Sequence, residues 1–110
     1  QWNYVRYWKD TPLLREINAA IARGVPVGGS SAGLAILGQF VFSAEHDTVT
    51  SAQALADPLD RRVSLVRDLL AIPALACVIT DSHFSERHRL GRLLVFLARL
   101  RDACPRGVEG

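Results

Sequence analysis

The sequence predicts an α/β fold in which crossover helices pack against a parallel sheet. Two observations support this class. Segments with helical periodicity alternate with short apolar runs along the 110 residues. One run, Leu75–Thr80, lacks polar alternation, which is typical of a strand buried in a parallel sheet. Because two or three strands are too few for a stable sheet of this kind, we expect further strands elsewhere in a longer parent protein.

The first third of the chain is predicted to contain a helix, a strand and a tight turn. Thr11 as N-cap and Pro12 as the first helical residue begin the helix, and Gly24 ends it. Val25–Val27 follows as a short strand. The pair Gly28–Gly29 then permits a sharp turn.

The middle of the chain is predicted to contain helices, a loop and segments whose residue pattern does not decide between helix and strand. A buried helix of small apolar residues is expected from Ala32 to about Leu37, and Gln39–Ala44 is either its end or a strand. Polar residues predict a loop over Glu45–Thr50. A short helix is expected over Ser51–Ala56, and Arg61–Leu70 has a mixed pattern with a strand-like start.

The last third is predicted to contain the buried strand Leu75–Thr80 and the longest helix, from Ser85 to about Arg101. Apolar residues recur at helical spacing in that helix. The expected buried stripe consists of Leu90, Leu93, Leu94, Leu97 and Leu100.

Composition limits the classes of function. Hydrophobic residues make up 49% of the chain, which predicts a folded unit. The net charge of +2 is too small to indicate a nucleic-acid or membrane partner, and no apolar run approaches the roughly 20 residues of a membrane span. No H-x-x-x-H or C-x-x-C spacing indicates a metal site, so no metal or cofactor is expected.

Two further features concern the chain as a whole. It contains no Met, so we expect residues 1–110 to form a single partial domain of a longer protein. Its two cysteines, Cys77 and Cys104, are expected to be free thiols in a reducing, cytoplasmic compartment; a disulfide between them is the alternative.

Ser31 is the candidate nucleophile. It lies in a G-x-S-x-G frame between Gly29 and Gly33, and small neighbours permit the sharp turn that exposes a nucleophile. The Ala32 amide is the expected oxyanion donor. The alternatives are a turn that reverses the chain or binds phosphate through its amides, and Ser30 as the competing hydroxyl.

His83 is the candidate general base, because a serine hydroxyl is a weak nucleophile until a base takes its proton. It lies 52 residues after Ser31 and follows the run that ends at Thr80. Adjacent parallel strands end at one edge of the sheet, so the two side chains are expected to meet there. A histidine that only caps a helix is the alternative, and His46 and His88 are competing bases.

Three arginines follow His83 and indicate a substrate. Arginine binds carboxylates with two hydrogen bonds, and Arg87, Arg89 and Arg92 gather near the start of the expected helix. Such a cluster is unfavourable at a helix N-terminus unless it serves binding. The alternative is a solvated basic face paired with Glu86 and Asp81.

These segments resemble the cyanophycinase and dipeptidase E group of serine peptidases, family S51. The group carries a G-x-S-A-G turn, present here as Gly29–Gly33. Its cyanophycinase-like members carry an Asp-x-His-Phe-x-x-Arg-x-Arg-x-x-Arg block, present here as Asp81–Arg92. The end of a further glycine-rich loop falls at Gln1, so the resemblance spans essentially the whole chain.

The resemblance implies a flavodoxin-like α/β sandwich, akin to class I glutamine amidotransferases, with helices on both faces of a parallel sheet that is incomplete in this chain. It implies a partial catalytic domain that cleaves peptide bonds at aspartyl residues, either Asp-X dipeptides or β-Asp-Arg units. Ser31 would be the nucleophile and His83 the base. The residues implied to line the substrate pocket are Gln1, Asp81, Arg87, Arg89 and Arg92.

Several points stay open at this stage. The acid of the catalytic triad is Asp47, Glu45 or a residue outside the chain. The oligomeric state is also open, and a homodimer is one assembly to test. A non-catalytic domain that binds acidic molecules or peptides is the alternative function. An α/β-hydrolase esterase follows from the G-x-S-x-G frame alone, but its histidine is not expected before an arginine-bearing helix.

Overall fold

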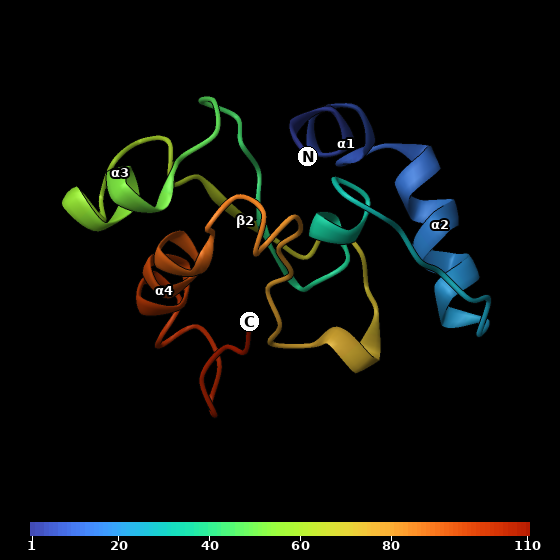
Figure 1. Cartoon of the computed structure of the whole chain (residues 1–110). Helices are drawn as coiled ribbons and strands as arrows, with labels where there is room; N and C mark the ends of the chain where they lie inside the picture. Colours follow the sequence, from blue (N-terminus) through green and yellow to red (C-terminus); the bar gives the residue numbers. More distant parts are fainter.

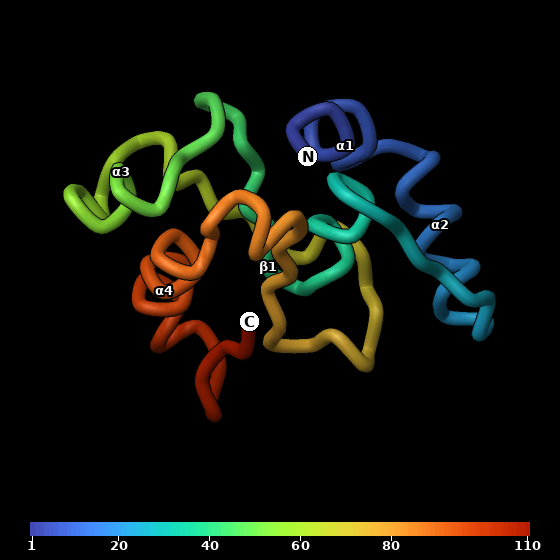
Figure 2. Tube along the Cα trace, viewed as in Figure 1, coloured from blue at the N-terminus to red at the C-terminus, as the bar shows by residue number.

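Strand β1 (Phe40–Phe42) lies at the centre of the computed structural model, which describes residues 1–110, with helices on either side (Figures 1 and 2). Helices α1 (Trp2–Trp8) and α2 (Pro12–Ala22) lie on one side, and α3 (Ser51–Ala56) and α4 (Leu90–Arg99) lie on the other. The remaining elements are η1 (Leu34–Ile36), β2 (Leu65–Arg67) and η2 (Pro73–Leu75).

Both faces of β1 are buried. Successive side chains of a strand point to opposite faces, so residues 40 and 42 lie on one face and residue 41 lies on the other. Phe40 and Phe42 belong to a core cluster that includes Phe96 of α4, whereas Val41 belongs to a second cluster with Leu14 of α2. The structure is therefore α/β, as the sequence predicts, and helices pack against both faces of its central strand.

The sheet itself differs from the parallel arrangement that the sequence predicts. Strands β1 and β2 pair antiparallel, with Phe40 opposite Arg67. Leu75–Thr80 does not form a strand; parallel pairing is limited to single bridges between Phe40 and Ile79 and between Val78 and Glu109. Only Ile79 of that run is fully buried. No further strand lies beside the run to hold it in extended pairing.

The predicted strand at Val25–Val27 is also not formed. The segment is exposed, with Val25 50% and Val27 43% accessible, and no strand pairs with it. Pro26 has no backbone N–H to donate to a ladder, so this segment lacks both a partner and one of its donors.

Local capping signals place two helices where the sequence predicts them. The Thr11 hydroxyl accepts a hydrogen bond from the Leu14 amide at 3.3 Å, and Pro12 occupies the first turn of α2. Thr50 and Gln53 form a capping box at the start of α3. Of the helix predicted over Ala32–Leu37, only the single turn η1 is helical, although residues 35–37 are buried as expected.

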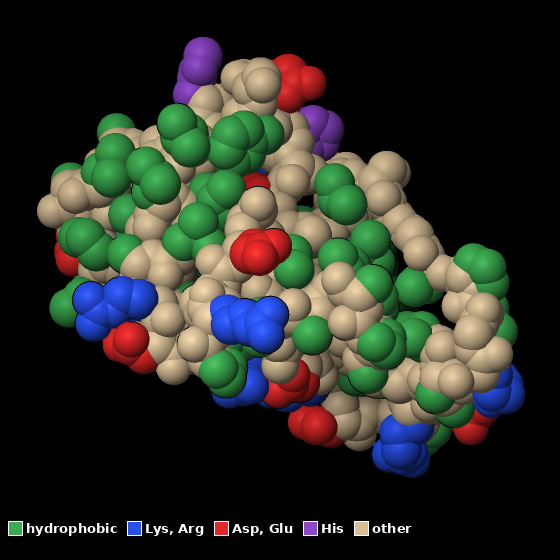
Figure 3. Space-filling view, turned by 90° about the horizontal axis from the view of Figure 1, so that it is seen from below, with side chains coloured by type: hydrophobic (Ala, Val, Ile, Leu, Met, Phe, Trp, Pro, Cys, Tyr) green, Lys and Arg blue, Asp and Glu red, His purple; other side chains and the backbone are tan.

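The last helix is shorter than predicted, and its predicted apolar stripe is buried only in part. Leu93, Leu97 and Leu100 pack, partly buried, against the core cluster around Phe96. It begins at Leu90, because turns occupy residues 84–89 and His88 has a positive φ of 48°. Its buried residues are Arg92, Val95 and Phe96. Leu90 and Leu94 of the predicted stripe are 58% and 53% exposed, and apolar side chains are spread over the surface (Figure 3).

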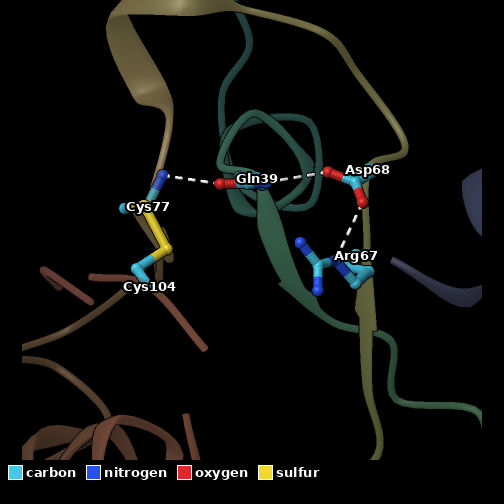
Figure 4. The surroundings of a disulfide bond; sticks show 5 residues. All are labelled: Gln39, Arg67, Asp68, Cys77 and Cys104. Carbon is cyan, nitrogen blue, oxygen red and sulfur yellow. Dashed lines mark hydrogen bonds and ion pairs between the residues drawn. A yellow bond between two sulfur atoms is a disulfide. The ribbon is translucent and has the colours of Figure 1, made fainter. Parts of the chain in front are cut away.

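The two cysteines are joined, which corrects the expectation of free thiols. The C-terminal segment returns alongside the chain before His83: the Ile79 amide donates to Glu109 O at 2.8 Å, and the Glu109 amide donates to Cys77 O at 2.9 Å. This return brings Cys104 beside Cys77. Gln39, at the start of β1, accepts a hydrogen bond from the Cys77 amide and donates one to Asp68 (Figure 4).

None of the helices has the length and apolar character needed to span a membrane.

Candidate functional site

The Ser31 hydroxyl and the His83 imidazole are within hydrogen-bond distance: Ser31 Oγ lies 2.9 Å from His83 Nε2. The two residues are 52 positions apart, and both are exposed to solvent. A nucleophile in contact with a base, both open to a ligand, is the arrangement that nucleophilic catalysis requires. With Nε2 as the acceptor of the serine proton, Nδ1 carries the ring hydrogen.

Both residues have an unfavourable backbone conformation. Eight non-glycine residues have positive φ, and Ser31 (51°) and His83 (52°) are among them. Such a conformation costs about 1–3 kcal/mol and persists only where the surroundings impose it. A strained turn around an exposed serine is also the geometry of a nucleophile elbow.

The turn around Ser31 is closed by glycine. The Gly33 amide donates to Ser30 O at 2.8 Å, and the backbone of Gly33 lies so close to Gly29 that a Cβ on Gly29 would be 2.5 Å from Gly33 C and O. Only glycine fits at position 29 without moving the turn. This contact explains one of the two glycines of the G-x-S-x-G frame in steric terms.

The Gly29→Ala variant is therefore expected to displace Ser31 and slow its reaction with an active-site serine reagent by roughly 10²-fold, because misplacement by about 1 Å has effects of that size. Gly28→Ala is the matched control, since its Cβ would meet nothing within 4 Å. Labelling kinetics of the two variants test this. Equal rates for Gly29→Ala and Gly28→Ala would contradict it.

The Ala32 amide is available as an oxyanion donor. It donates no hydrogen bond within the chain, and neither do the amides of Ser30 and Ser31. The helix that follows is only the single turn η1, so its dipole adds little. The free N–H groups here are thus individual amides of the turn and not the end of a long helix.

Thr80 connects the segment that carries His83 to the segment that carries Ser31, and the sequence alone does not predict this role. Its hydroxyl donates to Leu34 O at 2.8 Å and accepts from the Gly38 amide at 3.4 Å. It thereby joins the segment before His83 to the turn that follows Ser31. Nothing in the sequence singles out this threonine, because its partners lie more than 40 positions away.

Asp81, Arg89 and Arg92 come together in an ion-pair network. Asp81 Oδ1 lies 2.6 Å from Arg92 Nη2 and 3.3 Å from Arg89 Nη1. Burial lowers the pKa of the Arg89 guanidinium, with a further lowering from the positive charge of Arg92. One carboxylate thus neutralises only part of the positive charge here. Of the two partners expected for a solvated basic face, Glu86 makes no ion pair, whereas Asp81 pairs with Arg89 and Arg92 in a buried arrangement.

Arg87 is exposed and makes no ion pair, in contrast to its two neighbours. All three arginines line a small pocket of about 140 Å³. The other residues lining it are Thr48, Val49, Thr50 and Ser51. Guanidinium and hydroxyl donors around one pocket suit an anion such as a carboxylate.

Gln1 lines a second cavity of about 390 Å³ together with Ala32 and Asp47, so it lies on the side of the turn that follows Ser31. Asp47 accepts a hydrogen bond from the Thr48 amide. Neither Asp47 nor Glu45 hydrogen-bonds His83.

Neither competing histidine makes a side-chain hydrogen bond to Ser31. His46 is exposed and makes no side-chain hydrogen bond. The His88 side chain makes none either; its carbonyl accepts from the Ser51 hydroxyl at 2.5 Å and its amide donates to Ser85 O at 3.2 Å. No group of three or more His, Cys, Asp or Glu side chains is placed to hold a metal ion.

The chain is similar to several cyanophycinases. It is 32% identical over 101 residues to the cyanophycinase of Geminocystis herdmanii (strain PCC 6308), covering 91% of this chain and 34% of the relative. It is 30% identical to that of Trichormus variabilis and 29% identical to that of Synechococcus elongatus, again over 91% of this chain but 30% and 28% of those relatives. The chain therefore spans about a third of the length of these curated relatives. No family model and no solved structure matches it significantly.

Proposed function

We propose that this chain carries the nucleophile and base of a serine peptidase that resembles cyanophycinases and hydrolyses peptide bonds at aspartyl residues. The single observation that supports this most directly is the 2.9 Å contact between Ser31 Oγ and His83 Nε2. Similarity to proteins named cyanophycinase over 91% of the chain supports the same chemistry. In this proposal the chain is part of a larger flavodoxin-like catalytic domain.

Acylation follows from the positions of these groups. Ser31 Oγ attacks the substrate carbonyl carbon while His83 Nε2 takes the hydroxyl proton. The Ala32 amide stabilises the negative charge that develops on the carbonyl oxygen. The imidazolium then gives its proton to the leaving amine, the C–N bond breaks, and an ester to Ser31 remains.

Deacylation uses the same groups with water as the nucleophile. His83 takes a proton from water, the hydroxide attacks the ester carbon, and the proton returns to Ser31 Oγ as the acid product leaves. No step needs a metal ion or an organic cofactor.

The arginine pocket supports an acidic substrate. Arg87 is exposed and unpaired. Burial lowers the pKa of Arg89, and the neighbouring positive charge of Arg92 lowers it further. A substrate carboxylate in this pocket would add the negative charge that Asp81 alone does not supply. On this basis aspartyl peptides are the proposed substrate class.

The test is hydrolysis of cyanophycin and of Asp-X dipeptides by the full-length protein and, in a separate reaction without substrate, labelling of its reactive serine by a fluorophosphonate probe. Cleavage of either substrate, together with a probe adduct on the peptide that contains Ser31, is the expected result. Binding of acidic peptides with neither cleavage nor an adduct would instead favour a non-catalytic binding domain. An adduct on Ser31 with turnover only of simple esters would favour the esterase class.

A further inference from the structure

The buried ion pair between Asp81 and Arg92 does not have the properties of a substrate contact. The two side chains are only 4% and 2% exposed. Arg92 Nε donates to Asp81 Oδ2 at 2.8 Å, and Nη2 donates to Oδ1 at 2.6 Å, so the pair is bidentate. Charged residues are almost never this buried unless they are paired.

The remaining surface of the Arg92 guanidinium is also in use. Nη1 donates to Val49 O at 3.3 Å and to Thr48 Oγ1 at 3.4 Å. The guanidinium lies 5.0 Å from the Phe42 ring centroid and 5.8 Å from that of Phe96. A substrate carboxylate could reach Arg92 only by displacing Asp81, which would leave a buried charge without its partner.

The network instead holds the peptide directly before His83. Asp81 Oδ1 accepts a hydrogen bond from the Ser82 amide at 2.8 Å, and Arg89 Nη1 donates to Ser82 O. Ser82 is itself buried. Both polar groups of Ser82 are thus fixed: its amide by Asp81, which Arg92 anchors to α4, and its carbonyl by Arg89, the N-cap residue of α4.

This anchoring acts on the backbone of His83, whose φ of 52° lies in the left-handed region that non-glycine residues seldom adopt. Without an external constraint the loop would relax and carry the imidazole away from Ser31. Small displacements of reacting groups cost large factors in rate.

We infer that Asp81 and Arg92 are positioning residues that hold His83 against Ser31, and that substrate anions meet Arg87 rather than Arg92. This inference rests on the proposed function. Arg92 forms the buried floor of the arginine pocket, while Arg87 is its exposed, unpaired charge.

The experiment separates positioning from substrate binding with a probe that carries no carboxylate. A fluorophosphonate reacts when Ser31 Oγ forms a bond to phosphorus, fluoride leaves, and His83 takes the hydroxyl proton. The labelling rate therefore depends on the geometry of the Ser31–His83 pair and not on substrate binding in the arginine pocket. The variants are Arg92→Lys, Asp81→Asn and Arg87→Ala in the full-length protein, with KM and kcat measured on cyanophycin and Asp-X dipeptides.

Arg92→Lys and Asp81→Asn are expected to slow labelling and kcat by roughly 10- to 100-fold with KM changed by less than about threefold. Arg87→Ala is expected to raise KM and leave the labelling rate unchanged. Normal labelling by a folded Arg92→Lys variant with a raised KM would overturn the inference. Absence of labelling in the unaltered protein would instead overturn the proposed function.

A double variant keeps the test decisive if the single variants fail to fold. Replacing a buried ion pair by apolar side chains is often neutral for stability, so Asp81→Leu with Arg92→Met restores packing without restoring the hold on Ser82. A folded double variant that labels slowly supports the inference. A folded double variant that labels normally, or one that cannot fold, assigns the pair to the fold alone and overturns it.

Discussion

Replacing Ser31 with alanine is expected to abolish hydrolysis, with kcat reduced by roughly 10⁴- to 10⁶-fold, as for other nucleophile–base pairs. The change removes the Oγ that lies 2.9 Å from His83 Nε2 and leaves the base without a proton to take. Substrate binding should persist, because the arginine pocket does not involve Ser31. Steady-state kinetics of turnover, with binding measured separately by calorimetry, check both parts.

Ser30→Ala is the matched control for this experiment. Ser30 is the neighbouring exposed serine, and its side chain makes no hydrogen bond, so its loss should change kcat by less than about threefold. Full loss of activity in Ser30→Ala with normal turnover in Ser31→Ala would identify Ser30, and not Ser31, as the nucleophile.

Replacing Phe96 with alanine is expected to destabilise the protein by about 3–5 kcal/mol, because it combines lost burial with a cavity. Phe96 is 0% exposed and stacks on Phe42, with ring centroids 4.9 Å apart. It also lies beneath the Arg92 guanidinium. A loss of this size is a large part of the stability of a typical domain. Urea unfolding of the full-length protein measures it.

Leu94→Ala is the control on the same helix. Leu94 belongs to the stripe that helical spacing predicts to be buried, yet it is 53% exposed, so its truncation should cost well under about 1 kcal/mol. A larger loss for Leu94→Ala than for Phe96→Ala would mean that Leu94, rather than Phe96, faces the core.

Local signals in the sequence were sufficient for some elements. The start of α2 depends on Thr11 and Pro12, which act within one turn of the helix, and its position was predicted for that reason. The helix Ser51–Ala56 was likewise predicted, and its capping box is also local. Such contacts form between residues a few positions apart, so the pattern of residues specifies them directly.

Strands were predicted less well, because a strand needs a partner. Val25–Val27 and Leu75–Thr80 have the composition of buried strands, but no neighbouring strand pairs with the first, and only single bridges hold the second. The pairing of β1 with β2 could not be predicted either, since antiparallel partners are chosen by contacts more than 20 positions apart.

At the candidate site, residue types and spacing are enough to identify the groups that could react: a serine framed by glycines, a histidine after an apolar run, and arginines beyond it. The arrangement of these groups depends on long-range packing that spacing does not reveal. The tertiary structure placed Ser31 against His83, joined Cys77 to Cys104, and buried Arg92 on Asp81 while leaving Arg87 in solvent. The physical reason is that an arginine's burial and partners depend on how α4 packs against β1 and the loop at Thr48, and no spacing along the chain records that packing.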